Sequence, residues 1–190
     1  MTFNDNTVNI KPRGYHHGDL RAALIDEGLR LLAIRNADAM SLREVARGVG
    51  VSATSVYRHF PDKDALMAAL AVEGLKMLGA AQRVASAAAG DADAGFAASG
   101  RAYIRFALAN PALFRLVFTT PALKHADTPV LSDSEAGALL LANAARIADE
   151  GGGEAQVRAI QAWGMVHGIA MLMLDGQIPA EMDLVDRALC

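Results

Sequence analysis

Residues 41–60 of this 190-residue chain combine basic side chains with small hydroxyl side chains. The segment holds three arginines and one histidine against a single glutamate. Small hydroxyl groups on a helix can approach base edges in a DNA groove, and tyrosine or arginine can reach phosphates. The local field governs such binding, so this positive excess matters more than the net charge of −3 for the whole chain. These residue types therefore indicate contact with nucleic acid.

The spacing of capping residues and glycines within this segment predicts two short helices joined by a turn. Ser41 and Glu44 have the spacing of a capping box, in which the serine accepts from the glutamate N–H and the glutamate reaches back. A helix over 42–48 follows, and Gly50 suits the turn after it because glycine tolerates a left-handed backbone. A second short helix is expected over 53–59. Two such helices with a glycine-containing turn are typical of a helix-turn-helix.

The second of these helices is expected to have one buried face and one open face. Ser52 caps it, while Val56 and Phe60 lie one helical turn apart and point toward the core. The open face then holds Ala53, Thr54, Ser55, Tyr57 and Arg58. Taken alone, hydroxyl groups at these positions are explained equally well as an ordinary solvated helix surface.

The rest of the chain predicts an all-α fold. Alanine is abundant and aromatic residues make up 5%, which favours helix over strand. Apolar spacing, caps and breakers predict about nine helices, three in an N-terminal unit and the others in a helical bundle. Asn36 is expected to end the first helix because asparagine tolerates a left-handed backbone. The expected bounds are 19–36, 42–48, 53–59, 62–88, 93–110, 111–118, 133–150, 154–175 and 180–189, with a loop over 119–134.

Several classes of site are excluded by what the sequence lacks. The single cysteine, Cys190, excludes an intrachain disulfide and a cysteine-based metal site. A catalytic combination of His125, Asp127 and His167 lacks metal-ligand spacing, and no nucleophile elbow, P-loop or dinucleotide fingerprint is present. We therefore expect no enzyme activity, no metal and no cofactor. No apolar stretch of 18 residues is free of charge and no signal peptide is evident, which predicts a cytoplasmic protein without a membrane partner.

Three runs of the sequence closely resemble the TetR family of bacterial transcriptional regulators. They are YHHGDLRAAL at 15–24, SLREVARGVGVS at 41–52 and VYRHFPDKDAL at 56–66, in which residues 57–63 are the most specific part. The C-terminal part resembles the ligand-binding domain of the Trp-His-Gly type, through Trp163, His167-Gly168 and Asp175-Gly176.

The resemblance implies which residues contact double-stranded DNA. Helix N-termini would bind phosphates, and the first residues of the second short helix would contact bases. An arginine would reach the edge of the DNA groove. The residues implied are Ser41, Arg43, Ser52, Ala53, Thr54, Ser55, Tyr57, His59 and Lys63. A flexible basic arm over 1–17 would add Lys11, Arg13, His16 and His17.

The resemblance also implies a homodimeric repressor that binds a palindromic operator, with recognition helices about 34–36 Å apart. A small-molecule effector would release it by shifting the helix at 62–88. The DNA-binding domain would span 18–62, and the ligand-binding and dimerisation domain 63–190. The dimer would form through the last two helices, 154–175 and 180–189, where Ala159, Ala162 and Gly164 allow close approach or else pack within one subunit. The alternative is a ligand-independent DNA-binding dimer or adaptor whose C-terminal domain makes protein contacts alone.

The expected effector pocket is apolar, which favours a hydrophobic or aromatic small molecule. Aromatic and methionine side chains at helical spacing would line it, although such residues also commonly fill a core. The candidate residues are Met77, Tyr103, Phe106, Phe114, Phe118, Trp163, His167 and Met171.

Overall fold

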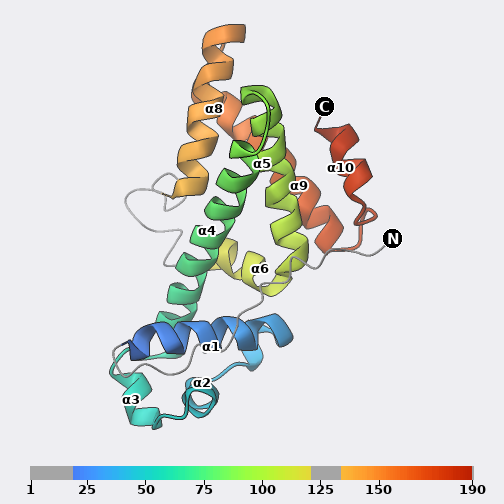
Figure 1. The fold of residues 1–190 in the computed structure, drawn as a ribbon. Coiled ribbons are helices and arrows are strands. Elements are labelled where there is room, and N and C mark those ends of the chain that lie inside the picture. Colours follow the sequence, from blue (N-terminus) through green and yellow to red (C-terminus); the bar gives the residue numbers. More distant parts are fainter. Residues whose placement is uncertain (1–18, 121–133, 190) are drawn as a thin grey trace.

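The computed structural model describes residues 19–120 and 134–189, and within them it contains nine α-helices and no strand (Figure 1). The all-α prediction and its helix count are confirmed. The expected basic arm and most of the loop at 119–134, with His125 and Asp127, lie outside the described residues. The helices are α1 (Leu20–Ile34), α2 (Leu42–Val49), α3 (Ala53–Tyr57), α4 (Lys63–Ala87), α5 (Ala92–Ala109), α6 (Pro111–Thr119), α8 (Glu135–Gly151), α9 (Ala155–Leu174) and α10 (Met182–Ala188).

Side-chain caps fix the start of most helices, as the sequence predicts for the N-terminal ones. The Asp19 carboxylate accepts from Ala22 N–H at 3.0 Å, and the Asp62 carboxylate accepts from Ala65 N–H at 2.8 Å. Each cap satisfies an N–H that has no partner within the helix. The start of α4, which follows Asp62, is therefore set locally.

Two local expectations about the junction between α1 and α2 are wrong. The backbone is extended at Arg35 and at Asn36, so Asn36 is not left-handed, and a 3-10 turn over Ala37–Ala39 follows. Ser41 does accept from Glu44 N–H at 3.3 Å, but the Glu44 side chain pairs with Arg35 instead of reaching back. The carboxylate thus ties α2 to the end of α1. Of the two capping-box contacts, the one made by Ser41 forms.

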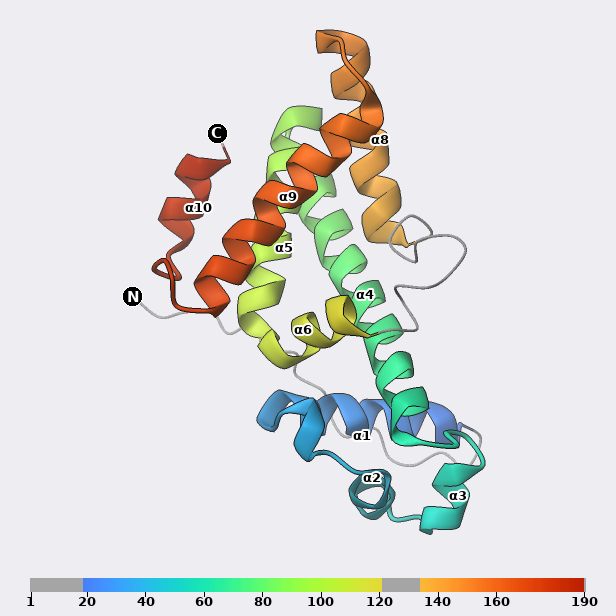
Figure 2. The same ribbon diagram turned by 180° about the vertical axis from the view of Figure 1, so that it is seen from behind.

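Helices α1 to α3 form a small unit at one end of the molecule, and α4 leads from it into the bundle (Figures 1 and 2). Leu66 and Leu70 at the start of α4 are fully buried and join the two parts into one core. A Cβ atom added at Gly28 of α1 would lie 2.9 Å from Leu70 Cδ2, so glycine allows this close crossing. The packing couples the start of α4 to the N-terminal unit.

The bundle consists of α4, α5, α6, α8, α9 and α10. Helix α4 packs on α5, α6 and α8, and α9 packs on both α5 and α8. Helix α10 follows a turn at Gly176, which has a φ of 67°, and its Val185 is fully buried. This arrangement brings α4, α5, α8, α9 and α10 around one partly open pocket.

Candidate nucleic-acid interface and internal cavity

The turn between α2 and α3 is set by Gly50. Its φ of 78° lies in the left-handed region, where a side chain would be strained. Its N–H donates to Arg47 O, and Val51 N–H donates to Ala46 O at 2.9 Å, which closes the end of α2. The geometry agrees with the helix-turn-helix prediction.

Helix α3 has one face buried in the core and one polar face exposed to solvent. Val56 and Phe60 are buried as expected, whereas Thr54 and Tyr57 are exposed. The Ser52 side chain accepts from Ser55 N–H at 3.2 Å, and the two hydroxyl groups are 2.9 Å apart. Thr54 and Tyr57 are therefore the open side chains of α3, while the Ser55 hydroxyl is occupied by the cap. The helix is also two residues shorter than expected and ends at Tyr57.

Basic side chains around α2 and α3 are exposed and available. The side chains of Arg43, Arg47, Arg58 and His59 make no hydrogen bond or ion pair with any other described residue. The acid of this segment, Glu44, is neutralised by Arg35. Arg47 and Arg58 were not among the DNA-contacting residues expected from the resemblance, although the charge excess of the segment was the signal for them.

Lys63 has a structural contact in addition to any role toward DNA. Its Nζ donates to the Asp38 carbonyl at 2.8 Å, and the side chain is half-buried. An ammonium group carries three protons, so two remain for another acceptor. The contact fixes the first turn of α4 against the junction between α1 and α2.

Eight of the nine residues expected to contact DNA lie in α2, α3 and their flanking turns, and Lys63 is the first residue of α4, so all nine are at the end of the molecule remote from α8 (Figure 1). Ala53, Ser55 and Lys63 are half-buried and the other six are exposed. The structure thus brings the set to one end of the fold.

A cavity of about 300 Å³ lies among α4, α5, α8, α9 and α10. Most of its lining is apolar, and its polar side chains are Gln82, Asp93, Ser99, Tyr103 and Trp163. Of the eight residues expected to line a pocket, Tyr103 and Trp163 line this one. The other six, Met77, Phe106, Phe114, Phe118, His167 and Met171, are not part of its lining.

Several of those six residues belong to an aromatic cluster behind the cavity wall. Phe114 lies 5.4 Å from Tyr103 and 4.9 Å from Phe118, and His167 lies 4.8 Å from Phe118, between ring centroids. Phe114 is fully buried. Edge-to-face contacts of this kind stabilise a core. The reading of these aromatics as core, which the sequence left open, therefore holds for Phe114.

A hydrogen-bonded chain connects the cavity wall to this cluster. Trp163 Nε1–H donates to the Tyr103 oxygen at 3.2 Å, and the Tyr103 hydroxyl lies 2.8 Å from His167 Nδ1. Burial lowers the pKa of His167 and raises that of Tyr103, so both groups are neutral near pH 7. The indole N–H can only donate, so the Tyr103 oxygen accepts from it. The Tyr103 O–H can then donate to Nδ1 of the neutral imidazole. The chain orients Tyr103 and Trp163 in the wall.

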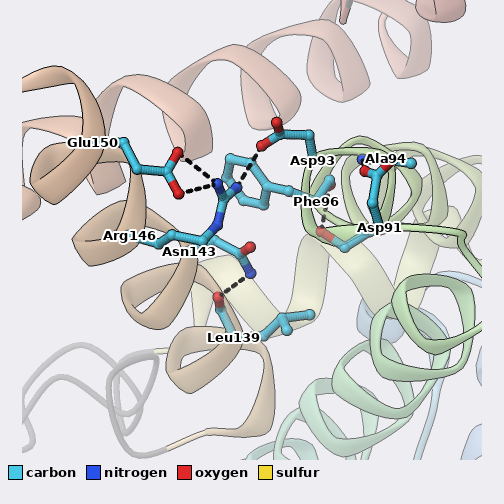
Figure 3. Close-up of polar contacts among 9 residues, drawn as sticks. Asp91, Asp93, Ala94, Phe96, Leu139, Asn143, Arg146 and Glu150 are labelled. Carbon is cyan, nitrogen blue, oxygen red and sulfur yellow. Dashed lines mark hydrogen bonds and ion pairs between the residues drawn. The ribbon is translucent and has the colours of Figure 1, made fainter.

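An arginine on α8 pairs with a carboxylate that lines the cavity (Figure 3). Arg146 Nη2 donates to Asp93 at 2.6 Å, and Nη1 donates to Glu150 at 3.0 Å. Asp93 belongs to the first turn of α5 and also lines the cavity. The pair joins α8 to the beginning of α5. Neither Arg146 nor Gln82 was expected, because single polar residues in alanine-rich helices have no spacing signal.

Comparisons with known proteins agree with this arrangement. Residues 24–70 match the family described as bacterial regulatory proteins, tetR family, and residues 96–189 match the tetracyclin repressor-like C-terminal domain. A solved structure of a protein of unknown function from Rhodococcus sp. RHA1 is similar, with 34% identity, a TM-score of 0.74 and 93% of each chain covered. A search of curated proteins gave no match.

Two further solved structures share the fold. A TetR family transcription regulator from Marinobacter aquaeolei VT8 has 18% identity and a TM-score of 0.69, with 89% of this chain and 91% of that chain covered. The TetR family transcriptional regulator PfmR from Thermus thermophilus has 21% identity and a TM-score of 0.59, with 86% and 97% covered.

The helix-turn-helix, the bundle and these matches define a DNA-binding transcriptional regulator and not an enzyme. The chain belongs to the TetR family.

Proposed function

We propose that this regulator is a repressor that leaves a palindromic operator when a small apolar effector fills the cavity. The observation that carries the proposal is the position of α4, which packs against α1 at one end and borders the cavity at the other. A ligand that moves one end of a rigid helix displaces the other. A coupling of about 1–3 kcal/mol between the two sites is enough for such a switch.

The start of α4 is tightly linked to the DNA-binding end. Leu70 contacts α1 at Gly28, and Lys63 donates to the Asp38 carbonyl. Farther along, Gly74 of α4 meets Leu113 of α6, where an added Cβ atom would lie 2.8 Å from Leu113 Cδ1. Contacts this close transmit a shift of α4 because there is no free space to absorb it.

Thr54 and Tyr57 are the side chains of α3 that we assign to DNA. Both side chains are exposed, and in this proposal Thr54 reaches base edges and Tyr57 reaches the phosphate backbone. Arg43, Arg47 and Arg58 add positive charge beside them. The other members of the expected set, Ser41, Ser52, Ala53, Ser55, His59 and Lys63, remain proposed contacts, and the arm at 1–17 remains a proposed minor-groove contact.

We place the dimer interface on α8 and α9 instead of α9 and α10. Helix α9 is long and apolar enough to cross a membrane, and only 17% of an 18-residue apolar stretch within it is buried inside the subunit. Its exposed face includes Gly164, where an added Cβ atom would meet nothing within 4 Å, whereas Ala159 is buried and Ala162 lines the cavity. The exposed large apolar residues of the two helices are Leu141, Val157, Ile160, Met165 and Leu172.

A second copy of the chain accounts for this apolar face better than a lipid surface does. Helices α8 and α9 pack along each other, so their exposed sides together offer a continuous surface for an isologous contact. Helix α10 instead packs on α5 and buries Val185 within its own subunit. We propose a cytoplasmic homodimer on this basis.

The proposal is tested by selecting bound sequences from a random DNA library and then measuring the stoichiometry on the selected site. A palindrome bound by two subunits is the expected result. Ile160→Asp on α9 should yield monomers with weak operator binding, whereas Ile34→Asp, at an equally exposed site on α1, should remain dimeric in sedimentation. A dimeric Ile160→Asp would overturn the assignment of the interface, and a non-palindromic site would overturn the dimeric operator.

A further inference from the structure

Gln82 is a buried polar side chain in the cavity wall that lacks one of its hydrogen bonds. The residue is 8% exposed and lines the cavity from α4. Its Nε2 donates to the Ser99 carbonyl at 3.4 Å, which directs the amide nitrogen to that acceptor. No donor among the described residues reaches its Oε1, which is buried. A buried carbonyl without a donor costs stability.

The other polar groups of the cavity wall already have partners. The Ser99 hydroxyl donates to the Phe96 carbonyl at 2.8 Å, and the Tyr103 hydroxyl is held between Trp163 and His167. The Asp93 carboxylate accepts from Arg146. Within the described residues, the Gln82 carbonyl is therefore the side-chain acceptor of the wall that most requires a donor.

We propose that the effector is an uncharged, mainly apolar molecule that donates one hydrogen bond, from a hydroxyl or N–H group, to Gln82 Oε1. This inference rests on the proposed effector site. The cavity volume of about 300 Å³ is roughly twice that of a cavity that accommodates benzene, so it suits about a dozen non-hydrogen atoms. A carboxylate or phosphate is disfavoured, because it would bring negative charge to a carbonyl oxygen in an apolar space.

The location of Gln82 also explains how such a ligand would act. Gln82 lies twenty residues beyond Asp62, or about 30 Å along α4. The long Nε2 contact leaves the amide weakly held, so that it can turn its oxygen toward a ligand. A donor bound at Oε1 would fix this side chain against the ligand, on the helix that leads to the DNA-binding unit.

The test compares two probes of similar shape that differ in hydrogen-bond donation. 2-Naphthol carries a hydroxyl donor, and 2-methoxynaphthalene carries an ether oxygen that cannot donate. Calorimetry on the full chain should give roughly tenfold tighter binding of 2-naphthol, as expected for one hydrogen bond. Gln82→Leu should bind both probes equally and should itself unfold at a higher temperature, because the unpaired carbonyl is gone.

Two further variants make the result specific. Gln82→Met keeps the unbranched shape without the carbonyl and should also bind both probes equally. It carries the test if the branched leucine side chain disturbs folding. Ser99→Ala removes a neighbouring hydroxyl of the same wall and should retain the preference for 2-naphthol.

The outcomes separate this inference from the proposed function. Equal binding of both probes to the wild type, or a preference that persists in Gln82→Leu and Gln82→Met, overturns the role of Gln82 but leaves the cavity as an effector site. Failure of the wild type to bind either probe overturns the cavity as an effector site, and the inference with it. Operator selection is independent of all three results.

Discussion

The two ends of α4 lie in opposite kinds of surroundings. At the N-terminal end, Leu66 and Leu70 are fully buried, and the crossing with α1 leaves no room for a side chain at Gly28. At the C-terminal end, Gln82 borders a cavity of about 300 Å³ and has an unpaired carbonyl oxygen. A close-packed region holds one geometry, whereas a cavity with an unsatisfied group can be remodelled by a ligand. The proposed function requires this difference, because it joins a rigid end that binds DNA to an adjustable end that would respond to an effector.

The largest expected effect comes from removing a side chain at the rigid end. Leu70→Ala should lower the free energy of unfolding by about 3 kcal/mol, because the truncation leaves a void in a close-packed site. Leu140→Ala, a half-buried leucine that already borders the cavity, should cost about 1 kcal/mol. Urea denaturation at one fixed protein concentration measures both. Equal losses would break the contrast between the two ends.

A smaller effect is expected from the turn that positions α3. Gly50→Ala should cost about 1–2 kcal/mol, because a side chain at a φ of 78° is strained. Gly90→Ala is the matched control, since neither glycine has an atom within 4 Å of an added Cβ and Gly90 lacks a positive φ. Comparing the thermal unfolding of the two variants gives the stability cost of a side chain at a positive φ. A Gly50→Ala variant as stable as Gly90→Ala would show that the turn tolerates another conformation.

The rigid end was largely predictable from the sequence because its constraints are local. Ser52, Asp62 and Gly50 each act through their own backbone neighbours, and Val56 and Phe60 follow helical spacing. Each therefore leaves a signal in a short stretch of residues. The exception is Glu44, whose partner Arg35 directly follows the end of α1 and takes the place of the second capping contact.

The adjustable end was less predictable because its site is assembled from five helices. The cavity depends on where α4, α5, α8, α9 and α10 leave space, and no local pattern reports that. Aromatic spacing predicted Tyr103 and Trp163 in the wall, but it also selected Phe114, which fills the core. Gln82 and Arg146 are single polar residues whose importance arises from burial and partners alone.

DNA binding tests the rigid end directly. Loss of one contact there should weaken the free energy of DNA binding by about 1 kcal/mol. Lys63→Ala should weaken binding to every sequence and lower the salt slope by roughly one unit, as for one phosphate contact. Thr54→Ala should instead relax the preference at one base position. Fluorescence anisotropy across salt concentrations and a set of operator variants distinguishes the two. An unchanged slope for Lys63→Ala would leave this lysine with its Asp38 contact alone.

The smallest effect concerns His167 at the edge of the adjustable region. Burial lowers its pKa, so as pH falls through the ordinary histidine value of about 6.5 the unfolded chain takes up a proton before the folded one does. Stability is therefore fully present above that value and decreases below it. Because the side chain is only part-buried, the loss between pH 7.5 and 5.5 should be smaller than the effects expected above. His167→Gln keeps an acceptor for the Tyr103 hydroxyl but does not titrate, so its stability should fall less over the same interval in urea denaturation. Parallel pH profiles for the two proteins would show that the imidazole is as solvated in the folded protein as in the unfolded one. The adjustable end would then be more open than the hydrogen bonds of Trp163, Tyr103 and His167 indicate.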